Sequence, residues 1–172
     1  PYQSVSAFAG SPLMVALEPL VVAGWLDPPA PPSGGFDPLR VDFGHVVPWR
    51  LAQLRQAYQG FTVKNALPEQ QAFADWRSQE ASWLDDYSLF MALETENQGK
   101  AWWHWPDAEC RREAQALAGA RLRLADEIGF WAFVQWCFDT QLALLKNYAN
   151  SQGVAIMGDL PIFIAHHSAD SW

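Results

Sequence analysis

Asp159 is the side chain whose position in the sequence points most directly to chemistry. It follows the apolar run 154–157 and Gly158. In a barrel or a doubly wound sheet, the carboxyl ends of parallel strands face the active site, where a carboxylate can bind substrate or hold catalytic groups. A solvated loop carboxylate, or one that caps a neighbouring helix, fits the position equally well. Asp159 is therefore a candidate site residue with its role open.

The polar cluster that follows resembles a metal site only at first glance. His166 and His167 are adjacent, and adjacent side chains on an extended segment point in opposite directions, so they rarely share one metal. His167 and Asp170 meet only if the segment turns helical. We therefore expect loop polarity here and no metal.

Glu80, Asp85 and Asp86 are the other acidic candidates. A glycosidase needs two acids held across a sugar, and Asp85 and Asp86 are neighbours that face different directions. A solvated helix face or hydrogen bonds between helices explain them better. The chain also has no glycine-rich phosphate loop and no nucleophile elbow, so we expect no cofactor.

Composition excludes several classes of protein. The net charge of −8 disfavours binding to nucleic acid and to anionic membranes. The longest nearly apolar run, 129–138, is too short to span a bilayer. Cys110 and Cys137 are the only cysteines, and we expect two reduced thiols in a cytoplasmic protein. The chain opens on Pro1 without an initiator methionine, so we expect its amino terminus to be cut.

The elements that must position Asp159 are mostly helical. In the first third, we expect a short strand at 13–17, a short helix at 18–23 that ends at Gly24, and a helix at 46–60. Five prolines and two glycines make 27–38 a surface loop; an interdomain linker is the alternative.

The clearest helix covers 68–97, because apolar residues recur there at spacings of three and four. That stripe should face a core, and most of the ten tryptophans should join it. Its members are Phe73, Trp76, Trp83, Leu84, Tyr87, Phe90 and Met91.

A second helical pattern runs over about 108–150, with Asp107 as its expected cap and Gly119 and Gly129 as possible breaks. Apolar residues of 128–148 cover more than one face, so this part should lie between two layers. A fully apolar strand at 154–158 follows, and it needs partners that this chain does not offer.

Four segments resemble the 4-α-glucanotransferases, the amylomaltases and disproportionating enzymes of glycoside hydrolase family 77. They are PYQSVSAFAGSPLMVAL at 1–17, DDYSLFMAL at 85–93, FVQWCFDTQ at 133–141 and GDLPIFIAHHSADSW at 158–172. Their order and spacing agree with the family, and the resemblance covers essentially the whole chain.

The resemblance implies an α/β fold, namely part of a (β/α)₈ barrel with a largely helical inserted subdomain. Residues 1–26 would be a barrel loop and short elements after an absent second strand. Residues 27–106 would be the helical insert with its proline-rich loop. Residues 107–172 would be a barrel helix and the third barrel strand with its following loop.

The implied activity is transfer of 4-α-glucanosyl segments between maltooligosaccharides through a covalent glycosyl-enzyme, with no nucleotide or metal. The three catalytic acids of the family lie on later strands, so this chain has no catalytic residue and should be inactive alone. Two positions carry over to the substrate cleft. Tyr2 would be an aromatic platform near the donor sugar, and Asp159 would accept hydrogen bonds from a glucose ring or hold the neighbouring acids.

Three positions depart from the family pattern. Ser11 stands where asparagine is usual, His167 replaces an acid, and Ser171 replaces a branched apolar residue. The last two adjoin the cleft side of the implied barrel, and they either alter substrate preference or mark a divergent sequence.

Two other functions stay open at this point. One is a non-catalytic helical module that binds carbohydrate or acts as a scaffold. The other is an α-glucan hydrolase in which water is the acceptor. The oligomeric state is not determined by the sequence.

Overall fold

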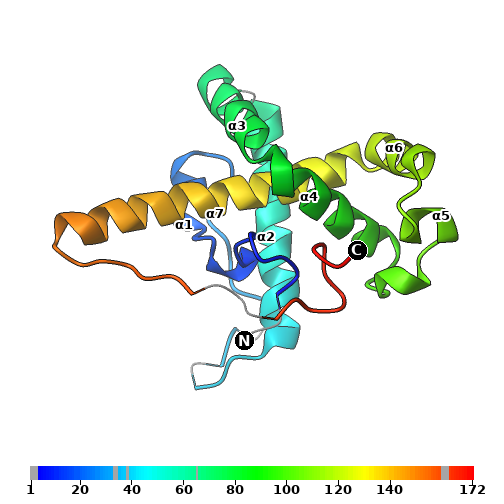
Figure 1. The fold of residues 1–172 in the computed structure, drawn as a ribbon. Coiled ribbons are helices and arrows are strands. Elements are labelled where there is room, and N and C mark those ends of the chain that lie inside the picture. The colour runs from blue at the N-terminus through cyan, green and yellow to red at the C-terminus, as the bar shows by residue number, and fades with distance from the viewer. Residues whose placement is uncertain (1–3, 33–34, 38, 65, 160–162) are drawn as a thin grey trace.

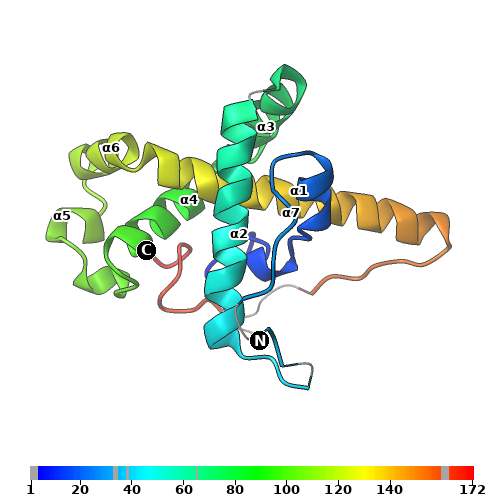
Figure 2. The ribbon, with the colours of Figure 1, turned by 180° about the vertical axis from the view of Figure 1, so that it is seen from behind.

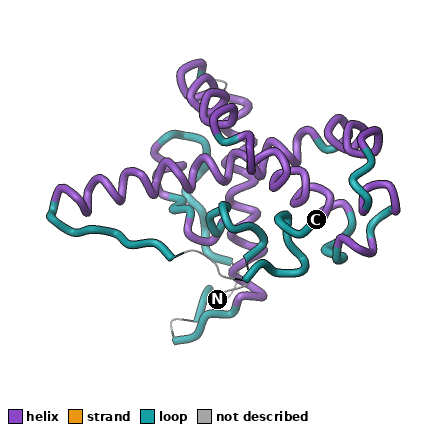
Figure 3. Tube along the Cα trace, in the orientation of Figure 1, coloured by secondary structure: helices purple, strands orange, loops and turns teal. Residues whose placement is uncertain are grey.

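The computed structural model describes residues 4–32, 35–37, 39–64, 66–159 and 163–172. Across these ranges all regular structure is helical, and the only pairing of strand type is a parallel bridge between Ser4 and Ile164 (Figure 3). The elements in chain order are η1 (Pro12–Met14), α1 (Glu18–Val22), α2 (Phe43–Lys64), α3 (Leu67–Gln79), α4 (Ala81–Glu96), η2 (Trp102–His104), α5 (Asp107–Cys110), α6 (Ala114–Arg123) and α7 (Ala125–Ser151).

The long helix α7 organises the packing. Helix α4 packs along its first half, α2 crosses it, and α3 and α6 also contact it (Figure 1). Gly129 permits the α2 crossing, because a Cβ atom at this position would lie 2.2 Å from the Tyr58 hydroxyl oxygen. In Figures 1 and 2 the last turns of α7 extend beyond the other helices.

Aromatic rings fill the space between α2, α3 and α7. The Phe133 ring lies at the centre of this cluster and is fully buried. The rings with centroids within 6.4 Å of it are those of Trp25, Tyr58, Phe61, Phe73 and Trp136. Tilted and edge-on rings at such distances contribute packing energy beyond their buried area.

Several expectations are confirmed. Helix α1 ends before Gly24, whose φ of +69° suits glycine. Helix α2 covers the expected 46–60 and extends at both ends, and the described part of 27–38 has no helix or strand. Apart from Trp103, every tryptophan is buried or packs against the core. The mostly helical character of the chain is also as expected.

The short strand expected at 13–17 is wrong. Pro12 opens the 3-10 turn η1, and the Ser11 hydroxyl accepts a hydrogen bond from the Leu13 N–H, 3.4 Å away. A capping serine followed by proline favours a helical turn over an extended chain.

The two long helical patterns are correct in type but not in continuity. The first is interrupted at Glu80, where ψ is 4°, so that α3 and α4 can each pack against α7. The second breaks at Arg112, with a φ of +55°, and at Leu124, while Gly119 and Gly129 lie inside helices. Asp107 is the first residue of α5, and no side chain caps that helix.

The strand expected at 154–158 is not formed. Val154 is 57% exposed and Met157 is 95% exposed. An apolar strand needs partner strands, and none lies beside this stretch among the described residues. Among all the described residues, no helix is both long enough and apolar enough to cross a membrane.

Candidate functional site

Two segments from opposite ends of the described chain lie side by side: the first segment, residues 4–16, and the last loop, residues 163–172. Ser4 and Ile164 form the parallel bridge, and the Ala169 N–H donates to the Val5 carbonyl over 2.8 Å. These contacts join the beginning of the described chain to its end. Figure 1 shows both segments beside the middle of the molecule, below α4 and α7.

Asp170 reinforces this junction. Its carboxylate accepts hydrogen bonds from the Ser6 hydroxyl at 3.0 Å and from the Ala7 N–H at 2.6 Å. Ser6 and Ser168 are both buried beneath the junction. Asp170 therefore has a structural role, because it binds the first segment, and it is not paired with His167.

Two glutamines of α7 hold the first segment against that helix. Gln135 accepts from the Gly10 N–H at 2.8 Å and donates to the Gly10 carbonyl at 3.0 Å. Gln141 makes the same pair of bonds with Ala16, at 2.7 and 3.0 Å. Each side-chain amide thus takes the place of a neighbouring strand, which satisfies backbone groups that the segment cannot pair internally.

Gly10 allows this close approach. A Cβ atom here would lie 2.2 Å from the Phe138 ring of α7, so any larger residue would push the segment off the helix. Arg50 of α2 adds a hydrogen bond to the Val15 carbonyl. The first segment is therefore fixed at residues 10, 15 and 16.

A cavity of about 370 Å³ lies between this segment and the helices. Its walls are mainly apolar, with hydroxyl groups of the first segment at one side. The described lining residues include no carboxylate, so they offer shape and weak polarity. Residues on its walls include Ser4, Ser6, Leu51, Tyr87, Met91 and Trp131.

Tyr87 is a neutral hydrogen-bonding group at this cavity. Burial raises its pKa far above the ordinary value, and the hydrogen bond from the Gln135 amide, 3.2 Å away, offsets this only in part. Its hydroxyl stays protonated and accepts from Gln135.

Of the two predicted site residues, the structure describes only Asp159, because Tyr2 lies outside the described residues. Asp159 is exposed at the end of the stretch 154–159, which has no helix or strand. In sequence, Tyr2 and Asp159 stand two and five residues before Ser4 and Ile164, the two residues of the parallel bridge.

Two of the three other acidic candidates, Glu80 and Asp86, have structural partners. Glu80 accepts from the Trp83 indole at 2.6 Å, and Asp86 pairs with Arg112 at 2.8 Å. The first bond lies at the start of α4 and the second joins α4 to the turn between α5 and α6, so neither is a hydrogen bond between two helices. Asp85 is exposed, as expected for a solvated helix face. Among the described residues, no group of three His, Cys, Asp or Glu side chains converges on a possible metal position.

Sequence reasoning did not single out Gln135 and Gln141. The signal was present, because FVQWCFDTQ places the amide of Gln135 between apolar residues and ends on a second amide, Gln141. Gln135 is buried, and a buried polar side chain needs a partner. The identity of that partner, a backbone segment 125 residues away, was not readable from the sequence.

Comparisons with known proteins identify what this arrangement resembles. The family model described as 4-alpha-glucanotransferase matches residues 1–172. A 4-alpha-glucanotransferase of Thermus thermophilus is 44% identical and one of Synechocystis is 36% identical, each over the whole of this chain. The chain spans 34% of the length of both relatives.

A solved structure agrees with these matches. The amylomaltase of Streptococcus agalactiae, in complex with acarbose, superposes with a TM-score of 0.88 at 33% sequence identity. The match covers all of this chain and 35% of that one. The described arrangement of helices and loops is therefore that of a region of amylomaltase.

Proposed function

The chain belongs to the 4-α-glucanotransferase family, glycoside hydrolase family 77, and from this premise we propose that it is part of an enzyme that transfers 4-α-glucanosyl segments between maltooligosaccharides. The observation that carries the proposal is the family match over all 172 residues. The superposition on an amylomaltase that holds acarbose, a compound of oligosaccharide type, supports the same substrate class.

The proposed reaction is a retaining double displacement. A carboxylate attacks the anomeric carbon, and a second carboxyl group gives its proton to the leaving 4-oxygen. The same group then takes a proton from the acceptor sugar as that sugar displaces the enzyme carboxylate. We place none of these acids in this chain, which would supply part of the substrate cleft and its support.

We propose that the helical chain is part of a (β/α)₈ barrel, divided at 1–26, 27–106 and 107–172 as above. In that fold α7 is a barrel helix and 154–158 is a strand. Exposed apolar side chains support this, because they require a cover that the described residues do not provide. They are Leu142, Leu144, Leu145, Tyr148, Val154, Ile156 and Met157.

We propose that Tyr2 and Asp159 contact the donor glucan. The junction of their segments through Ser4 and Ile164 supports a shared location. The Asp159 side chain is exposed, and an exposed carboxylate is suited to accept hydrogen bonds from sugar hydroxyls. The free thiols of Cys110 and Cys137 support a cytoplasmic location.

The first test is an assay on the full-length product of the gene that contains this segment. Incubation with maltotriose should give glucose and longer oligosaccharides. Shorter sugars alone would indicate a hydrolase, and no turnover would contradict the enzyme proposal. The 172-residue chain, assayed in parallel, should be inactive; transfer by it would show that the catalytic acids are not where we place them.

A binding measurement separates the remaining alternative. If the chain were a complete carbohydrate-binding module, the isolated protein would stay monomeric and bind maltoheptaose without help from other segments. A partial barrel should instead associate through its exposed apolar residues. Isothermal titration and light scattering on the same sample distinguish these outcomes.

A further inference from the structure

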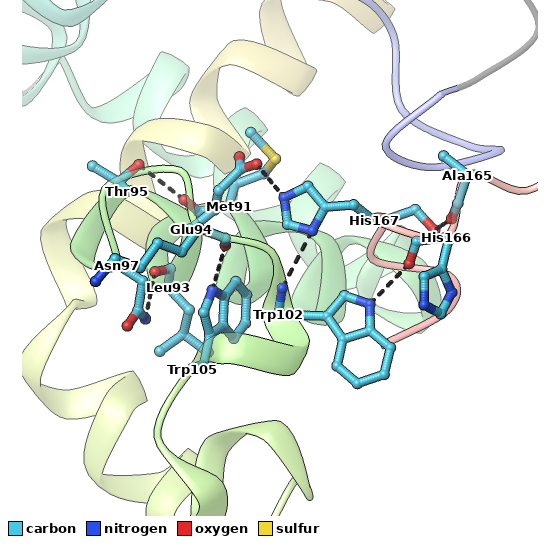
Figure 4. Close-up of polar contacts among 12 residues, drawn as sticks. Met91, Leu93, Glu94, Thr95, Asn97, Trp102, Trp105, Ala165, His166 and His167 are labelled. Atoms are coloured by element: carbon cyan, nitrogen blue, oxygen red, sulfur yellow. Dashed lines mark hydrogen bonds and ion pairs between the residues drawn. The ribbon is translucent and has the colours of Figure 1, made fainter.

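The His167 ring projects from the last loop, 163–172, toward α4 and η2, and both of its ring nitrogens have partners (Figure 4). Its Nε2 atom is 2.8 Å from Oε1 of Glu94, near the end of α4. Its Nδ1 atom accepts the backbone N–H of Trp102, at the start of η2, over 3.3 Å. One side chain thus joins three segments of the chain.

These contacts define the tautomer of His167. The Trp102 N–H can only donate, so Nδ1 must present its lone pair. The proton of the neutral ring is then on Nε2, from which it is donated to the Glu94 carboxylate. The hydrogen bond to Trp102 and the one to Glu94 therefore favour the same tautomer of His167.

The surroundings favour a fixed geometry. The side chains of His167 and Glu94 are only 29% and 24% exposed. The Trp102 indole donates to the His166 carbonyl at 2.9 Å, and the His166 ring stacks on Trp103 with centroids 4.4 Å apart. The loop is therefore held on α4 and η2 along several residues, and His167 and the fully buried Ser168 are its enclosed part.

The opposite side of the same loop holds the first segment, through Ala169 and Asp170 as described above. We propose that His167 is a positioning residue: by pairing with Glu94 and Trp102, it sets the place of loop 163–172 and, through Asp170, of residues 4–7. The effect on substrate rests on the proposed function, because Ser4 stands two residues after Tyr2 in the sequence.

The His167–Glu94 pair also gives the departure at position 167 a physical meaning. An acid at 167 would place a second negative charge near the Glu94 carboxylate, which is unfavourable. A cation at 94 would remove this repulsion and could pair with the acid. The residues at 94 and 167 therefore depend on each other, and His167 is matched to Glu94 through this hydrogen bond.

The test is a charge exchange in the full-length enzyme, with Glu94→Lys, His167→Asp and the double variant. Each single change should raise KM for maltotriose about tenfold with kcat within about twofold, since it disturbs positioning and not the acids. The double variant should restore KM to within about twofold by re-forming an ion pair. Additive single effects without rescue would overturn the proposal.

A second measurement does not depend on activity. Nitrogen-15 NMR of the 172-residue chain should show His167 with its proton on Nε2, and thermal unfolding should show the same rescue by the double variant. A proton on Nδ1 in the neutral ring would contradict the assignment. His45→Asp, at an exposed pair with Asp42, is the matched control and should leave both readouts unchanged. If the tautomer and the rescue are found but no transfer occurs, the proposed function fails and the His167–Glu94 pair stands.

Discussion

The two halves of α7 differ sharply in environment although both are rich in apolar residues. From Ile128 to Cys137 the helix is largely buried under α2, α3 and α4, and Phe133 is 0% exposed. From Leu142 to Tyr148 its apolar side chains face outward, and Leu144 is 66% exposed. Hydrophobicity alone therefore does not make a core, because burial needs a partner surface, and only the first half has one among the described residues.

The largest expected effect tests the buried half. Phe133→Ala removes the ring at the centre of the aromatic cluster, and it should lower the free energy of unfolding by about 3–5 kcal/mol because the rigid neighbours leave a cavity. Urea denaturation followed by circular dichroism measures this. Leu145→Ala, in the other half of the same helix, should cost less than about 0.5 kcal/mol. Equal losses would mean that the two halves do not differ in packing.

The next effect concerns the polar contact of the buried half. Gln135→Ala leaves both backbone groups of Gly10 without a partner, and it should destabilise the chain by about 2 kcal/mol. Gln141→Ala is the control, because Gln141 is only half-buried and water can replace its amide, at a cost of about 1 kcal/mol. Amide hydrogen exchange at Gly10 should accelerate only in the Gln135 variant. Unchanged exchange there would show that the bond is not formed.

The exposed half is tested by making it polar. Leu144→Gln with Leu145→Gln keeps helix propensity, so the unfolding free energy of this chain should change by less than about 0.5 kcal/mol. Self-association and binding of a hydrophobic dye should fall, since less apolar surface is exposed. In the full-length enzyme the same pair should cost about 2–4 kcal/mol if the barrel covers these residues.

Leu122→Gln is the control for this pair. Leu122 is 84% exposed on α6 and belongs to no apolar cluster of the described residues. Its substitution should leave dye binding of this chain and stability of the full-length enzyme unchanged. A full-length enzyme indifferent to the α7 substitutions would contradict the barrel proposal.

The smallest effect lies beside the buried half, where Arg123 donates two hydrogen bonds to Glu96 at 2.7 and 2.8 Å. These bonds hold the pKa of Glu96 below its ordinary value of 4.5, while partial burial acts in the opposite direction. A lowered folded pKa stabilises the chain above pH 4.5, and that contribution is lost as the pH falls through the folded value.

Glu96→Gln should therefore reduce stability by less than about 1 kcal/mol at pH 7, since both side chains are partly exposed and screened. The difference from the unsubstituted chain should shrink steadily as the pH falls below 4.5 and through the lowered folded pKa of Glu96. Chemical denaturation over a series of pH values measures it. A difference that does not change with pH would assign the effect to packing.

Helices were predictable from the sequence because their signal is local. The apolar spacing gave the region of α3 and α4, and proline and glycine placed the ends of α1. The interruption at Glu80 was not predictable, since it depends on how two helices reach the same side of α7. The breaks at Arg112 and Leu124 occur at residues with good helix propensity, so tertiary packing overrides propensity there.

The candidate site was predictable only in part. The family resemblance, since confirmed, located the two segments, but the roles of Tyr2 and Asp159 stay predictions. The glutamine contacts to Gly10 and Ala16 and the partner of His167 depend on contacts between residues far apart in sequence. Periodicity and local motifs carry no information about such contacts.

The separation of those partners has a consequence for synthesis of the protein. Gln135 and Gln141 each bind a backbone group 125 residues earlier. At roughly 5–20 residues per second, about 6–25 s pass between translation of Gly10 and of its partner. During this interval the nascent first segment has no amide to hold it, so its native position can form only after α7 has been made.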